Sequence, residues 1–459
     1  GDSLWATDIA PLLTEAPRNV HYVFTSFEEL TLSRSNRMNA LKARFEEAIE
    51  ANFTEEADKE HWRTHVHFVI DRVTEIEGGP GAFMSDYFDF MFSDDGVVDL
   101  GDRGQAQAPL PFVFAIDRGQ HWDPGGSLSP VVGQADEFAM AAYLGHFFNH
   151  RADLNARAEQ DTTSTIIPML DEDVTDRIIT RQVQLPDDMD EFDTLEFDIS
   201  VTCPYRNPFA CSEWDRIARI DLCLDEECTD RREVARWITP YWRRGNRRWF
   251  IDASPFLGLM RDGGQHTFRI EMGPEWERKT ERRATMSIRL SNNGAPKAVG
   301  AVRAFTGGNF NEDYNDNKPP FSFSVPDDAS LVELVVILSG HGQESGSNCA
   351  EWCDHRHDFI IRGIPVGLLR PEEGVTGALR GCADQAGAGV PPGQWGNWAP
   401  GRAYWCPGMP VPTHRFDITD RITKGMDANN VMQYFGTFAG NDPEGGNIAM
   451  SAYIVWYND

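Results

Sequence analysis

Two short segments of the 459-residue chain place cysteine, carboxylate and tryptophan close together: "CSEWDR" at 211–216 and "CAEWC" at 349–353. Two carboxylates that share a partly desolvated cleft push their pKa values apart, so one can give a proton while the other takes one. Tryptophan stacks on the apolar face of a sugar ring, and carboxylates and arginine hydrogen-bond its hydroxyl groups. The two segments therefore predict acid–base chemistry on a substrate that carries sugar.

Further tryptophans lie beside charged residues in "RWITPYWRRGNRRW" (236–249), "GPEWERK" (273–279) and "NWAPGRAYWCPGMPVP" (397–412). Tryptophan is also buried in the cores of β-sandwiches, and we favour that interpretation for Trp237 and Trp249. A binding site and a core position are equally compatible with four others, which each lie within two residues of a carboxylate or a cysteine: Trp214, Trp276, Trp352 and Trp405.

The segment around 349–357 also contains residue types that bind zinc, namely Cys349, Cys353, His355 and His357. Zinc sites usually combine one close pair of cysteines with a distant second pair, and the two histidines alternate along a predicted strand. A disulfide between the two cysteines is the better interpretation, so we expect no metal. It would hold Glu351 and Trp352 in a tight loop with little conformational freedom.

The net charge of −30 disfavours a nucleic acid, heparin or an anionic membrane as a partner, because phosphate and sulfate groups would be repelled. A neutral carbohydrate meets no such barrier, and no segment approaches the length of a transmembrane helix. All cysteines follow residue 200, and their spacing predicts four disulfides: Cys203–Cys211, Cys223–Cys228, Cys349–Cys353 and Cys382–Cys406. Disulfides indicate an oxidising compartment, so we expect the mature form of a secreted or periplasmic protein.

Residues 1–160 alternate strand-like with helix-like segments, which predicts an α/β domain. The strand-like segments are 20–26, 64–71 and 109–117, and the helix-like segments are 35–53, 81–92 and 135–158. The order of these segments and a proline just before the last strand resemble a thioredoxin-like domain. No cysteine occupies the position of that family's redox pair, so we expect no redox activity.

From about residue 162 the pattern is that of β-strands. "LEFDISV" at 195–201 alternates apolar with acidic or hydroxyl residues, and many similar short segments are separated by Gly, Pro, Asn and Asp. This pattern predicts antiparallel sandwiches. The polar stretch 306–320 is the predicted break between two of them, which gives an N-terminal α/β domain (1–160) and two β domains (161–305 and 306–459). Each β domain contains one Cys-x-Glu-Trp segment.

Four strings, "CSEWDR", "ITPYW", "CAEWC" and "NWAPGRAYWCPGM", resemble the bacterial peptide-N-glycosidase F family over about residues 165–459. The resemblance implies two adjacent eight-stranded jelly rolls, an active site in the cleft between them, and no metal or organic cofactor. It implies hydrolysis of the amide between asparagine and the innermost N-acetylglucosamine of an N-linked glycan on a glycoprotein or glycopeptide. We expect the chain to act as a monomer.

By position, the resemblance assigns Asp215 as the principal catalytic aspartate and Glu351 as the second essential carboxylate. Glu275 is the expected third acid, although its spacing from the next tryptophan differs by one residue from the family, so Glu271 is an alternative. The resemblance supports the predicted disulfides except Cys223–Cys228, for which it offers no counterpart. The expected substrate-binding residues, from the resemblance and the tryptophan clusters together, are Trp214, Arg216, Trp276, Trp352, Arg402 and Trp405.

Two other functions are compatible with the same residues. A lectin built from jelly rolls would bind a glycan without cutting it. A glycoside hydrolase would also use paired carboxylates, but it would cut between sugars and leave N-acetylglucosamine on the protein.

In the amidase, we expect Asp215 to transfer the proton, Glu351 to position water, and Glu275 to support binding.

Overall fold

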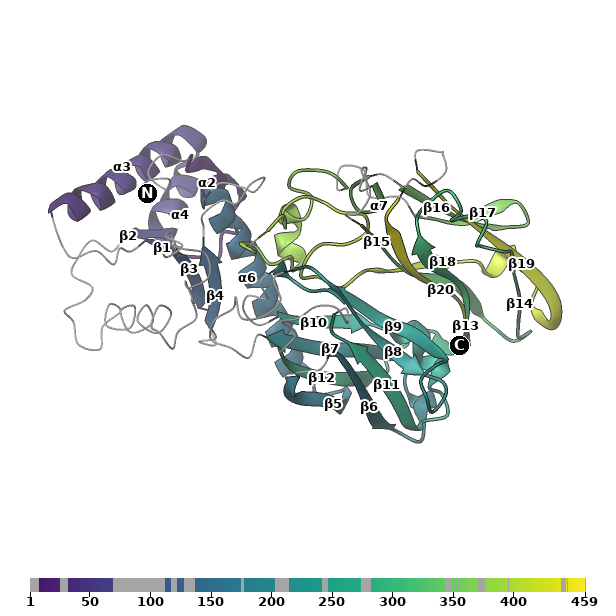
Figure 1. Cartoon of the computed structure of the whole chain (residues 1–459). Coiled ribbons are helices and arrows are strands. Elements are labelled where there is room, and N and C mark those ends of the chain that lie inside the picture. Colours follow the sequence, from purple (N-terminus) through teal and green to yellow (C-terminus); the bar gives the residue numbers. More distant parts are fainter. Residues whose placement is uncertain are drawn as a thin grey trace.

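The computed structural model describes residues 8–24, 32–68, 112–116, 122–127, 137–174, 177–202, 214–241, 247–273, 282–342, 349–353, 355–369, 376–394, 396–438, 443 and 445–458. Within these residues the fold is mainly β, as the sequence predicted, with four four-stranded sheets that follow an N-terminal region of helices and short strands (Figure 1). Among the described helices, none is long and apolar enough to span a membrane.

The first pair of sheets is built from residues 165–291, and its strand pairings are antiparallel. One sheet has the order β10-β7-β12-β5 and the other β6-β11-β8-β9. Along β7 the alternating side chains of Leu195, Phe197, Ile199 and Val201 are buried in the core, which confirms the half-buried strand predicted there. The strands are β5 (Thr165–Val174), β6 (Ile178–Leu185), β7 (Thr194–Thr202), β8 (Ile217–Cys223), β9 (Arg231–Ile238), β10 (Arg247–Asp252), β11 (Gly264–Glu271) and β12 (Arg282–Ser291).

The second pair of sheets has the orders β13-β20-β15-β18 and β14-β19-β16-β17. These strands are β13 (Lys297–Asn309), β14 (Phe321–Val325), β15 (Leu331–His341), β16 (His355–Ile361), β17 (Ile364–Leu369), β18 (Thr413–Asp417), β19 (Gly425–Phe438) and β20 (Asn447–Asn458). β13 crosses the boundary predicted between residues 305 and 306 and pairs with β20 along its length. We therefore propose to move that boundary to the connection between Ser291 and Lys297.

Strand β15 is apolar along almost its whole length because both of its faces are covered. Leu334, Val336 and Leu338 belong to the core of the second pair of sheets. Val335 and Ile337, which alternate with them, belong to the core of the first pair. The two sandwiches are thus joined by a shared apolar interface, and β15 ends at His341 beside the cleft between them.

The N-terminal region contains α2 (Ala10–Glu15), β1 (Tyr22–Phe24), α3 (Leu32–Asn52), α4 (Glu56–His65), β2 (Val66–Phe68), β3 (Phe112–Ile116), β4 (Trp122–Ser127) and α6 (Glu137–Gln160). β1 and β2 are parallel, and β3 and β4 are antiparallel. The strands and helices expected at 20–26, 35–53, 64–71, 109–117 and 135–158 each overlap one of these elements, whereas α4 was not anticipated. The helix expected at 81–92 lies outside the described residues, and the thioredoxin-like topology stays a prediction.

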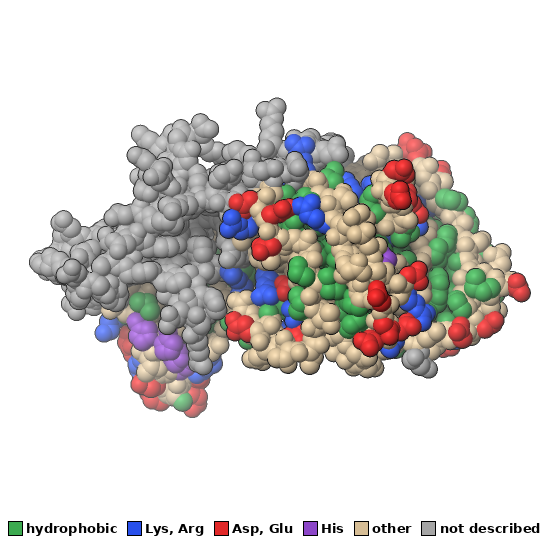
Figure 2. Space-filling view, turned by 90° about the horizontal axis from the view of Figure 1, so that it is seen from below, with side chains coloured by type: hydrophobic (Ala, Val, Ile, Leu, Met, Phe, Trp, Pro, Cys, Tyr) green, Lys and Arg blue, Asp and Glu red, His purple; other side chains and the backbone are tan. Residues whose placement is uncertain are grey.

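Four histidines of this region form a stacked surface group, visible as the purple patch in Figure 2: His21, His61, His65 and His67. The ring centroids of His65 lie 4.2 Å from His21 and 3.9 Å from His61. Burial, followed by the charge of neighbouring histidines, lowers the pKa of His21, and the same two causes, in the same order, lower the pKa of His61.

We expect this region to lose stability as the pH falls below about 6.5, the pKa of a free histidine. Below that pH the unfolded chain binds protons that the folded region excludes, so the free energy of unfolding decreases. Hydrogen exchange of peptides from α4, corrected for the intrinsic rate, should show faster opening at acid pH. His21→Asn should flatten this dependence, and an unchanged profile in that variant would contradict the assignment.

Candidate active site

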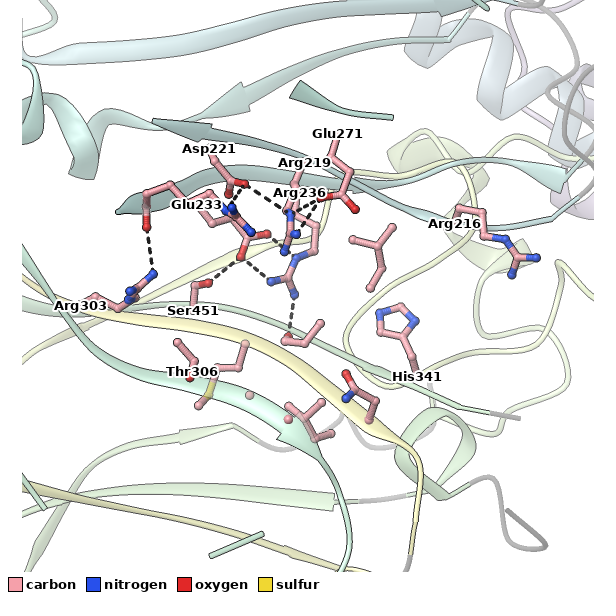
Figure 3. A pocket seen from close by; sticks show the side chains of 18 of the residues that line it. Arg216, Arg219, Asp221, Glu233, Arg236, Glu271, Arg303, Thr306, His341 and Ser451 are labelled. Atoms are coloured by element: carbon pink, nitrogen blue, oxygen red, sulfur yellow. Dashed lines mark hydrogen bonds and ion pairs between the residues drawn. The ribbon is translucent and has the colours of Figure 1, made fainter. Parts of the chain in front are cut away.

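A cavity of about 590 Å³ lies between the two sandwiches (Figure 3). Its wall from the first sandwich carries charged side chains of β8, β9 and β11: Arg219, Asp221, Arg231, Glu233, Arg236 and Glu271. Its wall from the second sandwich includes Arg303 and Thr306 of β13, His341 at the end of β15, and Ser451 of β20. Asp215 and Arg216 line it where the chain enters β8. The cavity is therefore polar on both sides and is open to a hydroxyl-rich ligand.

The structure brings together Asp215, Glu351 and Arg402, which are distant in the sequence. Arg402 Nη2 lies 3.6 Å from Asp215 Oδ2, and Arg402 Nε lies 3.2 Å from Glu351 Oε1. The side chain of Arg402 is fully buried, with its guanidinium carbon 4.5 Å from the ring of Trp352 and 4.9 Å from the ring of Trp405. One guanidinium thus stands between two carboxylates inside an aromatic cage.

The local fold around Glu351 fixes its carboxylate. Glu351 lies in the one-turn helix α7 (Cys349–Trp352), and its backbone carbonyl accepts a hydrogen bond from Ala403 N. The carbonyl of Ala350 accepts a hydrogen bond from His355 Nε2 at 2.9 Å. Gly342 N, just past the end of β15, donates to Glu351 Oε2 at 3.4 Å. These contacts tie the short helix to β15, to β16 and to the loop that carries Arg402.

The two histidines considered as zinc ligands belong to a buried chain of hydrogen bonds. Because the Ala350 carbonyl can only accept, His355 Nε2 carries the proton and His355 Nδ1 accepts from His357 Nε2 at 2.7 Å. His357 Nδ1 then accepts from the Tyr434 hydroxyl at 2.7 Å. Burial lowers the pKa of His355 to about 4, so both rings support helix α7 as neutral groups.

The electrostatics of the acid pair follow from burial and from the shared arginine. Burial, with the charge of Asp215 beside it, raises the pKa of Glu351 to about 7, although Arg402 opposes the rise. Burial also raises the pKa of Asp215, against the attraction of Arg402 and a hydrogen bond with Tyr241. Asp215 Oδ2 is buried and has no hydrogen-bond partner among the residues that the structure describes. A buried acceptor without a partner is unusual, and it leaves Asp215 able to bind a donor on a ligand.

The turn that carries Asp215 is held by Thr239 at the end of β9. The Thr239 hydroxyl accepts from Arg216 N at 2.8 Å and donates to the Trp214 carbonyl at 3.0 Å. Trp214 is 45% exposed, which suits a stacking surface for a sugar. Trp405 is buried and its indole N–H donates to Gly340, so it supports the site from below.

The structure describes only some of the predicted site residues. Glu275, Trp276, Cys203 and Cys211 lie outside the described residues. Glu271, the alternative third acid, lines the cavity and pairs with Arg219 at 2.7 Å and Arg269 at 2.9 Å. Burial alone would raise its pKa, but the two arginines outweigh burial and lower it, so Glu271 is ionised.

Other predictions are settled by contacts. The disulfides Cys223–Cys228 and Cys382–Cys406 are present, and Cys353 is disulfide-bonded. Trp237 and Trp249 are buried in the first core, which confirms the interpretation given to them.

A buried ion pair in the wall of the cavity joins the two sandwiches. Glu233 and Arg236, both on β9, form a bidentate pair with both N–O distances at 2.6 Å. Arg236 Nη1 also donates to Ser339 Oγ at 3.0 Å and to the carbonyl of Ala449 at 2.6 Å, in the second sandwich. Ser451 Oγ donates to Glu233 Oε2 at 2.6 Å (Figure 3). Attraction to Arg236 overcomes the effect of burial and lowers the pKa of Glu233, so the pair is charged.

We expect Arg236→Met to lower the free energy of unfolding by about 3–5 kcal/mol, because Glu233 would keep a buried charge without its partner. Thermal and urea unfolding of the whole chain measure this change. The matched control is Arg283→Met, which breaks an exposed pair with Asp173 and should cost less than about 1 kcal/mol. Equal effects of the two substitutions would show that the buried pair is not what holds the sandwiches together.

The loop that carries Arg402 and Trp405 also rests on the N-terminal region (Figure 1). Tyr143 on α6 donates to Asp384 in the 3-10 helix η5 (Ala383–Ala388) at 2.7 Å, and Arg380 pairs with Glu15 at 2.9 Å. One apolar cluster contains residues from both parts: Leu12, Leu13, Phe138, Met140, Phe147, Tyr241, Cys382, Ala383, Val390, Trp398 and Cys406. The N-terminal helices therefore form part of the scaffold of the site.

Comparisons with known proteins identify relatives of this chain. The family model "Peptide-N-glycosidase F, C terminal" matches residues 309–455. A curated relative, peptide-N(4)-(N-acetyl-beta-D-glucosaminyl)asparagine amidase F of Elizabethkingia miricola, is 26% identical over 288 residues, which cover 59% of this chain and 75% of the relative. The chain is thus similar to the peptide-N-glycosidase F family.

Solved structures show the shared fold. The crystal structure of a peptide-N(4)-(N-acetyl-beta-D-glucosaminyl)asparagine amidase matches with a TM-score of 0.50 and 22% identity, over 64% of this chain and 96% of that one. The structure of PNGF-II matches with a TM-score of 0.50 and 13% identity, over 67% of this chain and 68% of that one. The matches establish the jelly-roll architecture of the peptide-N-glycosidase F family for the β part of this chain.

Sequence reasoning missed three features of this site. Tyr241 was quoted within "ITPYW" but given no role, yet its hydroxyl accepts from Arg402 Nη2 at 3.1 Å. The Glu233–Arg236 pair had only its spacing on a strand as a signal, and that spacing is common. His341 had no signal, because nothing in "LSGHGQ" shows that β15 ends at the cleft.

Proposed function

We propose that this chain is a peptide-N-glycosidase that hydrolyses the amide between an asparagine side chain and the first N-acetylglucosamine of an N-linked glycan. The observation that carries the proposal is the pair of buried carboxylates, Asp215 and Glu351, on either side of Arg402. The proposal draws further support from the relative whose name describes this amidase activity. The substrate is a glycoprotein or glycopeptide.

An amide is a poor electrophile and its nitrogen is a poor leaving group, so proton transfer must accompany the attack of water. Water adds to the amide carbon, the C–N bond breaks, and the nitrogen leaves with a proton as a glycosylamine, while the asparagine becomes aspartate. We assign the proton transfer to Asp215, whose Oδ2 lies 3.6 Å from Arg402 Nη2 and accepts no hydrogen bond from the described residues. Glu351 positions the water, and Arg402 limits the repulsion between the two acids.

The proposal includes several statements about the surroundings of the site. The sugars would be contacted by Trp214, Arg216, Trp352 and Trp276, the last of which lies outside the described residues. Arg402 and Trp405 would support these side chains from beneath. Glu275 or Glu271 would be the third acid. The N-terminal region would hold the loop of Arg402 in place, and the disulfides support a secreted or periplasmic location for a monomeric enzyme.

Mass spectrometry of a digested glycoprotein tests the reaction. In water labelled with ¹⁸O, the amidase should release intact glycans and convert each occupied asparagine to an aspartate that carries one label. A lectin would bind the glycoprotein and leave its mass unchanged. A glycoside hydrolase would leave N-acetylglucosamine on asparagine, so either of these spectra would overturn the proposal.

We expect kcat/KM to rise as the pH increases through about 7, because Glu351 in the free enzyme ionises there. Stability should change in the opposite direction. The folded-state pKa of Glu351 lies above its unfolded value, so its contribution to stability is present at low pH and is lost as the pH rises through about 7. Initial rates on a glycopeptide across pH 5–9 measure the first effect. Glu351→Gln should remove this limb from any residual activity, and a limb that persists would assign it to another group.

A further inference from the structure

His341 is the one cavity-lining residue at the end of β15, and its position follows from the contacts of its neighbours. Gly340 N donates to Ala403, next to Arg402, and Gly342 N donates to Glu351. The imidazole ring of His341 stacks on Trp405 with a centroid distance of 4.9 Å and an interplanar angle of 26°. Figure 3 shows this ring projecting into the cavity, on the wall opposite Glu271 and Arg219.

The proton on this ring can be placed by counting donors. His341 Nε2 lies 2.7 Å from Ser339 Oγ, and Ser339 is fully buried. Arg236 Nη1 donates to the same Oγ, since a guanidinium has no acceptor. The serine hydroxyl hydrogen therefore needs another acceptor, and His341 Nε2 is the one found among the residues that the structure describes. If Nε2 carried the proton instead, a buried hydroxyl hydrogen would have no partner, which is costly.

The proton of the neutral ring is consequently on Nδ1. Burial, followed by the charges of Arg236 and Arg402, lowers the pKa of His341 to about 3, so the ring is neutral at the pH of an enzyme assay. Nδ1 has no hydrogen-bond partner within the described part of the chain. A neutral N–H donor that lines a polar cavity suits an uncharged oxygen acceptor, such as a hydroxyl or an acetamido carbonyl of a sugar.

We propose that His341 is a specificity-determining residue that donates a hydrogen bond from Nδ1 to an uncharged oxygen of the substrate's inner sugars. The inference deepens the proposed function and rests on it. Ser339 and Arg236 act through His341 as positioning residues, because they fix which ring nitrogen carries the proton. The Glu233–Arg236 ion pair is thereby connected to the substrate by hydrogen bonds through Ser339 and His341.

Nuclear magnetic resonance of protein with ¹⁵N-labelled histidine tests the proton position without substrate. The signals of His341 are assigned by comparison with the His341→Asn variant. At pH 7 we expect a neutral ring with the proton on Nδ1, and N,N′-diacetylchitobiose, which consists of two N-acetylglucosamines, should shift that N–H signal. A ring protonated on Nε2, a charged ring, or an Nδ1–H signal that the disaccharide leaves unchanged would each overturn the proposal.

Kinetics on a glycopeptide separate a hydrogen bond from a packing role. An asparagine side chain can place its N–H₂ near the position of Nδ1, whereas glutamine reaches the position of Nε2. We expect His341→Asn to keep KM within about threefold of wild type, and His341→Gln and His341→Phe to raise KM about tenfold or more with a smaller change in kcat. His266→Asn, on β11 outside the cavity lining, is the matched control.

Equal effects of His341→Asn, His341→Gln and His341→Phe on KM would indicate a packing role alone and would overturn the proposal. Ser339→Ala should raise KM and let Nε2 compete for the proton in the spectrum. If the wild-type protein released no glycan, the proposed function would fail, while the resonance experiment with the disaccharide would still decide the role of His341.

Discussion

We expect Asp215→Asn to lower the rate of glycan release by at least about a hundredfold, and by up to about ten-thousandfold, while the chain stays folded. This is the range that a positioned general acid or base contributes. The substitution keeps the shape of the side chain and removes its ability to exchange a proton. It also removes one of two negative charges beside Arg402, so the fold should lose little stability. Release of labelled glycan from a glycopeptide under single-turnover conditions measures the effect.

The matched control for this experiment is Asp221→Asn in the same cavity. Asp221 is buried on β8 among Arg219, Arg231 and Arg269, with the nearest pair at 3.3 Å. Because three arginines lie nearby, we expect the charge of Asp221 to stabilise the fold and to take no part in proton transfer. We expect this variant to keep activity within about tenfold, and its loss should appear mainly as lower stability. Comparable losses of activity in both variants would mean that the charge of the cavity matters, and not proton transfer at position 215.

Asp215→Asn should also change the pKa of the neighbouring Glu351. The charge of Asp215 is the second largest cause, after burial, of the raised pKa of Glu351. Without that charge the pKa of Glu351 should fall from about 7 toward its ordinary value. The titration of Glu351 thus depends on the charge of Asp215, and Arg402 opposes the rise in pKa that burial and this charge cause. This coupling is the physical reason for placing both acids on opposite sides of one cation.

The sequence predicted the parts of this site that depend on local pattern. The alternation of "LEFDISV" and similar segments indicated sandwiches, because one face of each strand must be apolar. The Glu-Trp segments indicated a sugar-binding site with acid–base chemistry, because tryptophan stacks on sugar rings and carboxylates hydrogen-bond hydroxyl groups. The distance between these segments could not be read from the sequence, since it depends on how the two sandwiches pack through Val335, Ile337 and the Glu233–Arg236 pair.

The role of Arg402 shows the limit of the sequence most clearly. Its position in the last loop suggested a side chain that lines the cleft and contacts substrate. In the structure it is fully buried, with hydrogen bonds to the carbonyl of Pro400 at 3.0 Å and to Tyr241. Its loop packs against the N-terminal helices, which no resemblance over 165–459 could reveal. Contacts between segments far apart in the chain decide whether a charged side chain faces the substrate or its neighbours.

Arg402→Met should abolish most activity and also lower the free energy of unfolding by about 3–5 kcal/mol, because it leaves two buried carboxylates without their cation. Without the arginine the pKa of Glu351 should rise further above 7, so the acids would fold as neutral groups. Stability of the variant should therefore fall as the pH rises, and the difference from wild type should be smallest near pH 5. Unfolding midpoints across pH 5–8 measure this dependence.

A second substitution separates the two consequences of losing Arg402. Adding Glu351→Gln to Arg402→Met removes one of the unbalanced charges, so the double variant should regain part of the lost stability at pH 8 without regaining activity. The methionine fills a similar volume within the cage of Trp352 and Trp405, which keeps the loss of packing small. A double variant as unstable as the single one would show that Arg402 supports the loop through its hydrogen bonds to backbone carbonyls and not through the acids.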